Sequence, residues 1–99
     1  MTYKLRFHEL ALAEWRKLDG SVREMFKKKL PERPENPRVP SAALSGMPDC
    51  FKIKLRQLGY RLIYRVDDDA AFVSIIAVGQ RDRGKAYSAA RRREADPLA

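Results

Sequence analysis

The sequence predicts a small single α+β domain in which a strand and two helices precede a three-strand antiparallel meander and a last helix. The chain has 99 residues, room for one hydrophobic core, and its 44% apolar and 34% charged residues are typical of a folded soluble domain. Apolar residues alternate with other residues at 3–7 and 50–66, which predicts strands, and recur at helical spacing between 9 and 30. We therefore expect one domain over residues 1–99.

The first strand and the first helix are separated by a change of period. Apolar side chains alternate with cations over residues 3–7, as expected of a short strand with one buried face. From Glu9 onwards the apolar residues recur at helical spacing, and Asp19 and Gly20 form a typical C-terminal stop. The apolar stripe of this predicted helix consists of Leu10, Ala11, Trp15 and Leu18.

A second helix is predicted between Ser21 and Leu30. Ser21 and Glu24 match a capping box, in which the hydroxyl accepts from an amide of the first turn and the glutamate reaches back. A proline inside a helix costs roughly 3 kcal/mol, so Pro31 ends the helix near Leu30. Prolines at intervals of three, as far as Pro40, favour a stiff loop over a polyproline docking segment. The inward residues are then Val22, Met25, Phe26 and Leu30, and the outer ones Lys27, Lys28 and Lys29.

Residues 50–66 predict a β-hairpin with two chemically different faces. Apolar residues occupy odd positions in the first arm and even positions in the second. Because directly opposed residues share a face, the apolar residues lie on one face only if each odd-numbered residue is paired with an even-numbered one. A two-residue turn at 58–59 satisfies this condition and puts Leu55 opposite Leu62. One face of the hairpin then carries five cations, Lys52, Lys54, Arg56, Arg61 and Arg65.

A polar turn and a buried strand follow the hairpin. Three aspartates at 67–69 predict the turn, and the almost wholly apolar residues 71–78 predict a central strand that is covered on both faces and ended by Gly79. A short helix is expected over residues 85–92. The last residues, about 91–99, are expected to form a basic, frayed tail.

The charge balance points to an anionic partner. Lys and Arg number 21 against 13 Asp and Glu, which gives a formal net charge of +8 and a pI near 10. Such an excess is typical of proteins that bind nucleic acid, an acidic protein segment or a lipid surface. The membrane is the weakest option, because no apolar run is long enough to span it and the N-terminus lacks the apolar core of a signal peptide. We therefore expect a cytoplasmic protein.

Metal or cofactor chemistry is not predicted. Cys50 is the single cysteine and His8 the single histidine, so the sequence offers neither an internal disulfide nor a usual set of metal ligands. We interpret Cys50 as a small buried thiol and His8 as an ordinary residue at a strand end. No cofactor is expected.

The cationic face of the hairpin invites an anion. Like charges opposite one another destabilise a sheet, and few acidic residues lie close by in the sequence to neutralise them. Residue types alone leave three interpretations open: contact with nucleic acid, a face that is solvated or covered by a partner, and a catalytic surface.

Three segments resemble a known family. The stretches EWRKLDGSVREMFKKKL, ALSGMPDCFKIKLRQLGYRLIYRV and VGQRDRGKAY strongly resemble the RelE family of toxins from bacterial toxin-antitoxin systems. The resemblance runs without gaps from Tyr3 to about Ala90. It implies a RelE-like fold, similar to small microbial ribonucleases, with a mainly antiparallel sheet and two N-terminal helices packed on one face. It also implies a ribosome-dependent endoribonuclease that cleaves mRNA in the ribosomal A site and inhibits translation.

The same resemblance implies metal-independent cleavage, in which the ribose 2′-hydroxyl attacks the adjacent phosphate. Because crowding among cations lowers the pKa of a lysine, Lys54 is the predicted general base, supported by Lys52. Arg61 would hold the phosphate, Arg81 would face the leaving oxygen as proton donor or electrostatic clamp, and Tyr87 would stack on a base. Further contacts with message or ribosomal RNA are predicted at Lys27, Lys28, Lys29, Arg56, Arg65, Arg83 and Lys85. On residue types alone, the lysine triplet is a solvated face and Tyr87 a packed side chain.

The implied partners are a RelB-type antitoxin, the small-subunit RNA of the ribosome, and mRNA, with operator DNA bound only through the antitoxin complex. Two other classes are considered: a ParE-like toxin that acts on DNA gyrase, and a non-catalytic basic module that binds an acidic antitoxin and operator DNA. The presence of the whole catalytic set argues against both. Two features depart from the family pattern, since Pro31 and Pro34 should shorten or kink the second helix, and Ser45 stands where some relatives have a basic residue.

Overall fold

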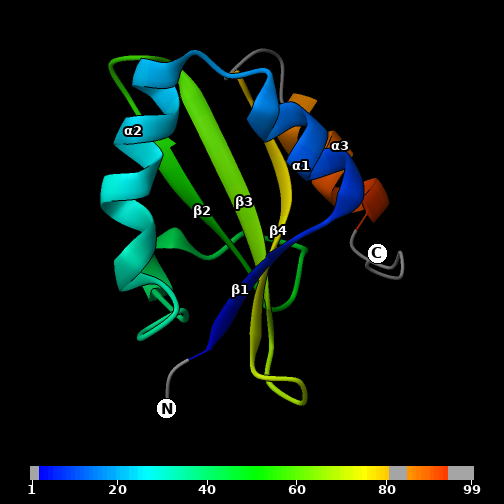
Figure 1. Ribbon diagram of the computed structural model, residues 1–99. Coiled ribbons are helices and arrows are strands. Elements are labelled where there is room, and N and C mark those ends of the chain that lie inside the picture. The colour runs from blue at the N-terminus through cyan, green and yellow to red at the C-terminus, as the bar shows by residue number, and fades with distance from the viewer. Residues whose placement is uncertain (1–2, 81–84, 94–99) are drawn as a thin grey trace.

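The described chain confirms the predicted order of elements. The computed structural model describes residues 3–80 and 85–93, and within them four strands form one sheet in the order β1-β4-β3-β2 (Figure 1). No helix in these ranges is long and apolar enough to cross a membrane. The strands are β1 (Lys4–Phe7), β2 (Cys50–Leu55), β3 (Tyr60–Asp67) and β4 (Phe72–Gln80), and the helices are α1 (Glu9–Arg16), α2 (Gly20–Lys29) and α3 (Lys85–Arg93).

β4 is a central strand of the sheet. β1 pairs with it in parallel and β3 pairs with it antiparallel from the other side, so the sheet is mixed but mainly antiparallel. The residues from Val73 to Val78 are buried, which confirms a strand covered on both faces. The prediction that Gly79 ends this strand is wrong, because Gly79 pairs with Arg61 and β4 continues to Gln80. Pairing with β3 outweighs the modest cost of a glycine in a strand.

The sheet separates two apolar cores. α1 and α2 cover one face, on the near side in Figure 1, and the large side chains of Phe26 and Tyr64 are completely buried there. This confirms that the two N-terminal helices pack on one face. The other face is covered by α3, which lies behind α1 in Figure 1 and contributes small alanines that allow close packing. This second core consists of Met47, Cys50, Ile63, Ile76, Ala77, Ala86, Ala89 and Ala90.

The β2–β3 hairpin has the predicted faces but a different register. Leu55 pairs with Tyr60 and not with Leu62, so residues 56–59 form a four-residue loop in place of the predicted two-residue turn. Both loop lengths are even, and the division of side chains between the two faces is therefore preserved. Gly59, with a φ of 71°, lets the longer loop close through a hydrogen bond of 2.8 Å from its amide to the carbonyl of Leu55.

The junction between α1 and α2 differs from the prediction. α1 ends at Arg16, well before the expected stop, and Asp19 is the N-cap residue of α2. Ser21 therefore lies inside the first turn, and the predicted capping box is wrong. Arg23 organises the junction instead, because its guanidinium donates to the main-chain carbonyls of Arg16 and Leu18 at the end of α1.

The buried stripe of α2 is narrower than predicted. Val22, Phe26 and Leu30 are buried, whereas Met25 is 38% exposed. Met25 lies about 100° around the helix from Phe26. Because α2 packs near β2, the edge strand of the sheet, the sheet does not extend far enough to cover Met25. On α1, Leu10 is 50% exposed, so the prediction that it belongs to the buried stripe of the first helix is wrong.

The proline-rich connection is attached to the sheet by Tyr64. α2 ends where the sequence predicts and is followed by a 3-10 turn, Leu30–Glu32, that accommodates Pro31. The hydroxyl of Tyr64 donates to the carbonyl of Pro37 at 2.6 Å and accepts from the guanidinium of Arg33 at 2.9 Å. Burial raises the pKa of Tyr64, so its hydroxyl keeps the proton that it donates.

Glu14 and Arg93 hold α3 against the edge of β4. β1 ends opposite Ile75, and beyond this point the carboxylate of Glu14 accepts from the amide of Val78 at 3.1 Å. The guanidinium of Arg93 donates to the carbonyl of Ile76 at 3.0 Å and pairs with Glu14 through two contacts of 2.8 and 3.1 Å. The two side chains thus bond to backbone groups of β4 that a neighbouring strand would otherwise pair with. Because Arg93 makes these contacts, α3 continues one residue beyond its predicted end.

Candidate active site

Three cations lie together on the sheet face that also carries α3. Lys54 on β2 is directly opposite Arg61 on β3, and Lys52 lies two residues earlier on β2. Directly opposed residues of an antiparallel pair have Cβ atoms about 5 Å apart, and alternate residues of one strand are about 6.6 Å apart. The observed register therefore brings these three residues, called the cationic cluster below, closer together than the predicted register does.

Repulsion within the cationic cluster lowers the pKa of Lys54. The largest cause is the charge of Lys52, followed by desolvation of the amine and by the charge of Arg61, with a smaller part from Arg56. A lowered pKa raises the fraction of neutral amine, which is the form that can accept a proton. The direction of this shift is the one that a general base requires.

A cavity of about 250 Å³ opens beside the cationic cluster at the loop end of the hairpin. Two members of the cluster and the additional cation Arg56 line this space. Its charge and its size suit a phosphate together with part of a nucleotide base. The lining residues are Lys54, Leu55, Arg56, Tyr60 and Arg61.

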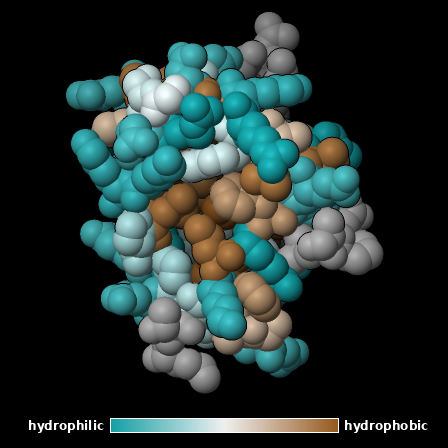
Figure 2. All heavy atoms as spheres, viewed as in Figure 1, coloured by the Kyte–Doolittle hydropathy of each residue, from teal (hydrophilic) through white to brown (hydrophobic). Residues whose placement is uncertain are grey.

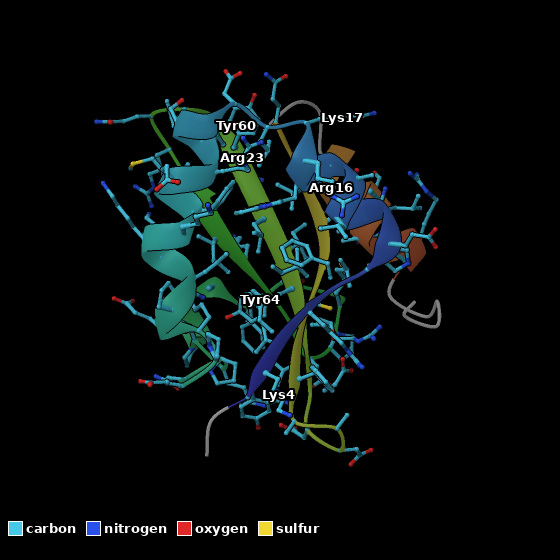
Figure 3. All side chains as sticks on the ribbon, in the orientation of Figure 1. Lys4, Arg16, Lys17, Arg23, Tyr60 and Tyr64 are labelled. Carbon is cyan, nitrogen blue, oxygen red and sulfur yellow. The ribbon has the colours of Figure 1, made fainter. Side chains whose placement is uncertain are left out.

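Tyr60 is a residue of this site that sequence reasoning missed. It is partly buried, and its hydroxyl accepts a hydrogen bond from the side-chain amide of Gln80 at 3.3 Å. In Figure 3 it lies at the same end of the molecule as Arg16, Lys17 and Arg23. Its position next to Arg61 in the sequence was the available signal. It lines the cavity although its side chain also packs against the core under α1 and α2.

The three lysines of α2 are exposed, as predicted. Lys27 pairs with Glu24 at 3.4 Å on the helix surface. Lys29 reaches across the edge of β2 and donates to the main-chain carbonyl of Lys54 at 3.1 Å. One end of the lysine triplet is thereby joined to the strand that carries the cationic cluster.

Arg65 lies in a different environment from the cationic cluster. It is four residues from Arg61 along β3, roughly 13 Å away. Its guanidinium bonds to the carboxylate of Asp67 at 2.8 Å, and the same carboxylate accepts from Ser74 at 2.7 Å and pairs with Arg6 at 3.3 Å. Burial raises the pKa of Asp67, but these hydrogen bonds outweigh it, and the pKa is lowered. The structure therefore places Arg65 in a polar network, at the end of the cluster remote from Arg61 and diagonal to Lys52.

Four predicted residues fall in or just before α3. Arg81 and Arg83 lie outside the described residues. Lys85 and Tyr87 belong to α3, but their side chains lie outside the described part of the chain. The backbone of Tyr87 is thus on the helix that packs on the same sheet face as the cationic cluster.

His8 and Cys50 have structural positions. The Nδ1 atom of His8 accepts from the amide of Leu10 at 3.1 Å and caps α1. Cys50 is 1% exposed and belongs to the second core, as expected for a small buried thiol. Within residues 3–80 and 85–93, no group of three or more His, Cys, Asp or Glu side chains is placed to hold a metal ion.

A second hollow, on the face covered by α1 and α2, is mainly apolar. Figure 2 shows hydrophobic side chains gathered on this face between the two helices, with hydrophilic side chains around them. Exposed apolar surface of this kind is typical of protein–protein contacts. A groove of about 310 Å³ in this region is lined by Leu5, Phe7, Trp15, Lys27, Leu30, Pro31 and Pro34.

Comparison with known proteins relates this chain to bacterial toxins. Residues 5–84 match the family model of the ParE toxin of the type II toxin-antitoxin system, parDE. The chain is 55% identical over 93 residues to the mRNA interferase toxin RelE of Escherichia coli, which covers 94% of this chain and 98% of that protein. A mutant of E. coli RelE in the free state has a similar structure, with a TM-score of 0.87, 53% identity and coverage of 94% and 98%. A chain of the intact E. coli RelBE toxin-antitoxin complex matches with a TM-score of 0.79 and 56% identity, covering 82% of this chain and 99% of that chain.

Proposed function

Because this chain belongs to the RelE family within the RelE/ParE toxin-antitoxin superfamily, we propose that it is an mRNA interferase that cuts messenger RNA in the ribosomal A site and so inhibits translation. The cationic cluster carries this proposal, since three mutually repelling cations lie beside a cavity and one of them is an amine with a lowered pKa. A phosphate of the message would neutralise charges that the sheet leaves crowded.

The proposed reaction needs no nucleophile from the protein. The ribose 2′-hydroxyl gives its proton to the neutral amine of Lys54, and its oxygen attacks the adjacent phosphorus. The bond to the 5′-oxygen of the next nucleotide breaks, which leaves a 2′,3′-cyclic phosphate and, after protonation, a free 5′-hydroxyl. The charge of Lys52 lowers the pKa of Lys54 and so raises the fraction of neutral amine. The planar fork of Arg61 holds the phosphate while its negative charge grows.

Arg81 and Tyr87 complete the proposed site. Arg81 follows β4 directly in the sequence, and we assign it to the leaving oxygen, mainly as an electrostatic clamp because an arginine gives up its proton reluctantly. Tyr87 on α3 would stack on an unstacked base and orient the 2′-hydroxyl. The pair of Glu14 and Arg93 supports this assignment, because it fixes α3 to the body of the domain.

The ribosome would supply alignment that this small site lacks. An amine base and an arginine clamp are weak tools on flexible RNA, whereas a codon already held in a bent conformation needs less ordering. Positive surface away from the cavity would bind ribosomal RNA through phosphate contacts that weaken with salt. We assign this role to Lys27, Lys28, Lys29, Arg65, Arg83 and Lys85. Among those whose side chains the structure describes, Arg65 is held in a polar network. Arg56 lines the cavity itself and would contact the message there.

The regulatory partner proposed for this chain is a RelB-type antitoxin. A similar E. coli chain was solved in the RelBE toxin-antitoxin complex, and a mutant of E. coli RelE was solved with a peptide of the antitoxin RelB. The apolar groove between α1 and α2 would give such a partner apolar area to bury, and the excess of positive charge would attract an acidic segment. Operator DNA would be bound only through the complex of the two proteins.

The proposal is tested with ribosomes that hold a defined message. The wild-type chain should cut within the A-site codon and leave a cyclic phosphate, and a 2′-deoxyribose at the cut position should abolish cutting because the nucleophile is missing. Arg81→Ala should slow the cut at saturating protein. An equal rate on the ribose and the deoxyribose message would contradict the proposed chemistry.

One observation favours a second candidate. The matching family model is that of the ParE toxin. The ParE-like alternative implies action on DNA gyrase. Inhibition of gyrase-driven supercoiling by the purified chain, with translating ribosomes and their message unaffected, would support this second function. The cationic cluster favours the first function, cleavage of messenger RNA.

A further inference from the structure

A groove runs along the outside of the β2–β3 hairpin, between its loop and α2. Its volume is about 260 Å³. Both apolar and cationic side chains line it, and they come from two elements that are separate in the sequence. The lining residues of this hairpin groove are Met25 and Lys29 from α2, and Lys54, Leu55, Arg56, Gln57 and Leu58 from the hairpin.

Two exposed apolar side chains border the hairpin groove. Met25 is 38% and Leu58 is 44% exposed, and they are two of the four large apolar residues most exposed in the described part of the chain. Leu58 occupies a loop position at which small polar residues and glycine prevail, so the fold itself gives no reason for a leucine there. Single exposed apolar residues are ordinary, but two that line one groove form a surface suited to a ligand.

The cationic side of the hairpin groove continues from the candidate active site. Lys54, Leu55 and Arg56 line both this groove and the cavity beside the cationic cluster, so the two hollows adjoin. Lys29 is placed over the edge of β2 by its hydrogen bond to the carbonyl of Lys54. An RNA chain that leaves the cavity toward α2 would therefore pass between Arg56 and Lys29.

A nucleotide matches this combination better than a protein segment does. Its base has a flat apolar face that can cover aliphatic and thioether side chains, and its phosphate can meet the cations at the border. An apolar peptide would fill the floor of the groove but would bury Lys29 and Arg56 without a counter-charge.

We propose that the hairpin groove binds one nucleotide of the message next to the scissile phosphate, with its base on Met25 and Leu58 and its phosphate between Lys29 and Arg56. This inference rests on the proposed function, because the message reaches the groove through the adjoining cavity. Aliphatic side chains read no hydrogen-bond pattern, so the groove selects its base by size. It prefers a purine, which covers more of the floor, over a pyrimidine.

The test measures binding and not cutting. Ribosomes are programmed with a message whose A-site codon carries 2′-deoxyriboses, and the Kd of the fluorescently labelled chain is determined. Leu58→Glu is compared with the wild type. Leu10→Glu is the matched control, because it adds the same charge at an exposed leucine of α1, an element that packs on β4 and lies away from the β2 edge.

We expect Leu58→Glu to raise the Kd about tenfold and Leu10→Glu to change it less than twofold. An abasic nucleotide is then moved through the codon and its neighbours. At one position the tenfold difference between the wild type and Leu58→Glu should fall below twofold, because the base that the groove holds is gone.

Two results would overturn the proposal. One is an equal Kd for Leu58→Glu and the wild type, and the other is a difference that persists with the abasic nucleotide at every position, which would mean that the groove touches another component. Loss of antitoxin binding by Leu58→Glu with unchanged ribosome binding would likewise assign the groove to a protein. Failure of the proposed function has a separate signature, namely that the wild type binds the deoxy message as expected but leaves an all-ribose message intact.

Discussion

Lys54 on β2 lies directly opposite Arg61 on β3, and this pairing of two cations is unfavourable for the sheet that contains it. Lys52 adds a third positive charge to the same face and is the largest cause of the lowered pKa of Lys54. The fold therefore holds together charges that repel one another. Such an arrangement suits a surface whose task is to meet an anion and to lower the pKa of one amine.

Replacing Lys52 by alanine should slow cleavage at pH 7. Removal of the largest repulsion raises the pKa of Lys54, so a smaller fraction of the amine is neutral and able to accept the proton. Since a base works in its neutral form, the rate should rise with pH and level off above the pKa of Lys54, and in Lys52→Ala this rise should move to higher pH. We expect a rate about fivefold lower at pH 7 in single-turnover assays between pH 6 and 8.5. Identical pH profiles for the two proteins would exclude Lys54 as the titrating base.

Replacing Lys54 by methionine should stabilise the isolated protein. The pKa of Lys54 is lower in the folded than in the unfolded chain, so the unfolded chain binds more protons at pH values between the two. The charge thus opposes folding below the folded pKa, and this penalty declines as the pH rises from the folded pKa to the unfolded one. A thermal melt at pH 7 should give a higher Tm for Lys54→Met, with the difference shrinking toward pH 10. Lys4→Met, on β1 at the other edge of the sheet, is the control and should lack this pH-dependent gain.

Replacing Arg93 by methionine should destabilise the fold by about 3 kcal/mol. The change removes the partner of Glu14 and leaves the carbonyl of Ile76 without the donor that it has in the native structure. Urea denaturation measures the loss. Lys27→Met removes the exposed pair with Glu24 and should cost less than about 0.5 kcal/mol. Similar losses for the two variants would show that the contact between α1 and α3 contributes no more than a surface pair.

Replacing Tyr64 by phenylalanine should cost about 1–2 kcal/mol of unfolding free energy. Its hydroxyl joins the carbonyl of Pro37 to the guanidinium of Arg33, and both lose a buried partner. Tyr60→Phe removes only the hydrogen bond of 3.3 Å with Gln80 and is expected to lose less. If denaturant midpoints of the two variants agree, the proline-rich connection is not anchored through Tyr64.

The sequence alone predicts the order of elements well and the contacts between them less well. Alternation fixes the face of each hairpin residue, and this prediction survives the register error because the loop length stays even. The four-residue loop depends on the φ of 71° at Gly59, which residue type allows but does not require. The start of α2 depends on Arg23 binding the end of α1, a contact that no local pattern indicates.

Some residues of the candidate site can likewise be predicted from the sequence pattern, and others cannot. Lys52 and Lys54 share a face because they are two residues apart on a strand, so the alternation of side chains along the strand is enough to bring them together. Tyr60 alternates with Arg61 along β3, so the pattern assigns it to the apolar face and does not indicate that it lines the cavity. The pair of Glu14 and Arg93, which are 79 positions apart, has no signal in composition or spacing, because it satisfies backbone groups of a third element.

The most direct test measures the saturating single-turnover rate at which Lys54→Ala cuts a message in the ribosomal A site, together with its affinity for the same ribosome. We expect a rate at least 100-fold below that of the wild type, an affinity within about threefold, and partial recovery of the rate when small primary amines are added. A rate equal to that of the wild type would contradict the assignment of the proton transfer to Lys54.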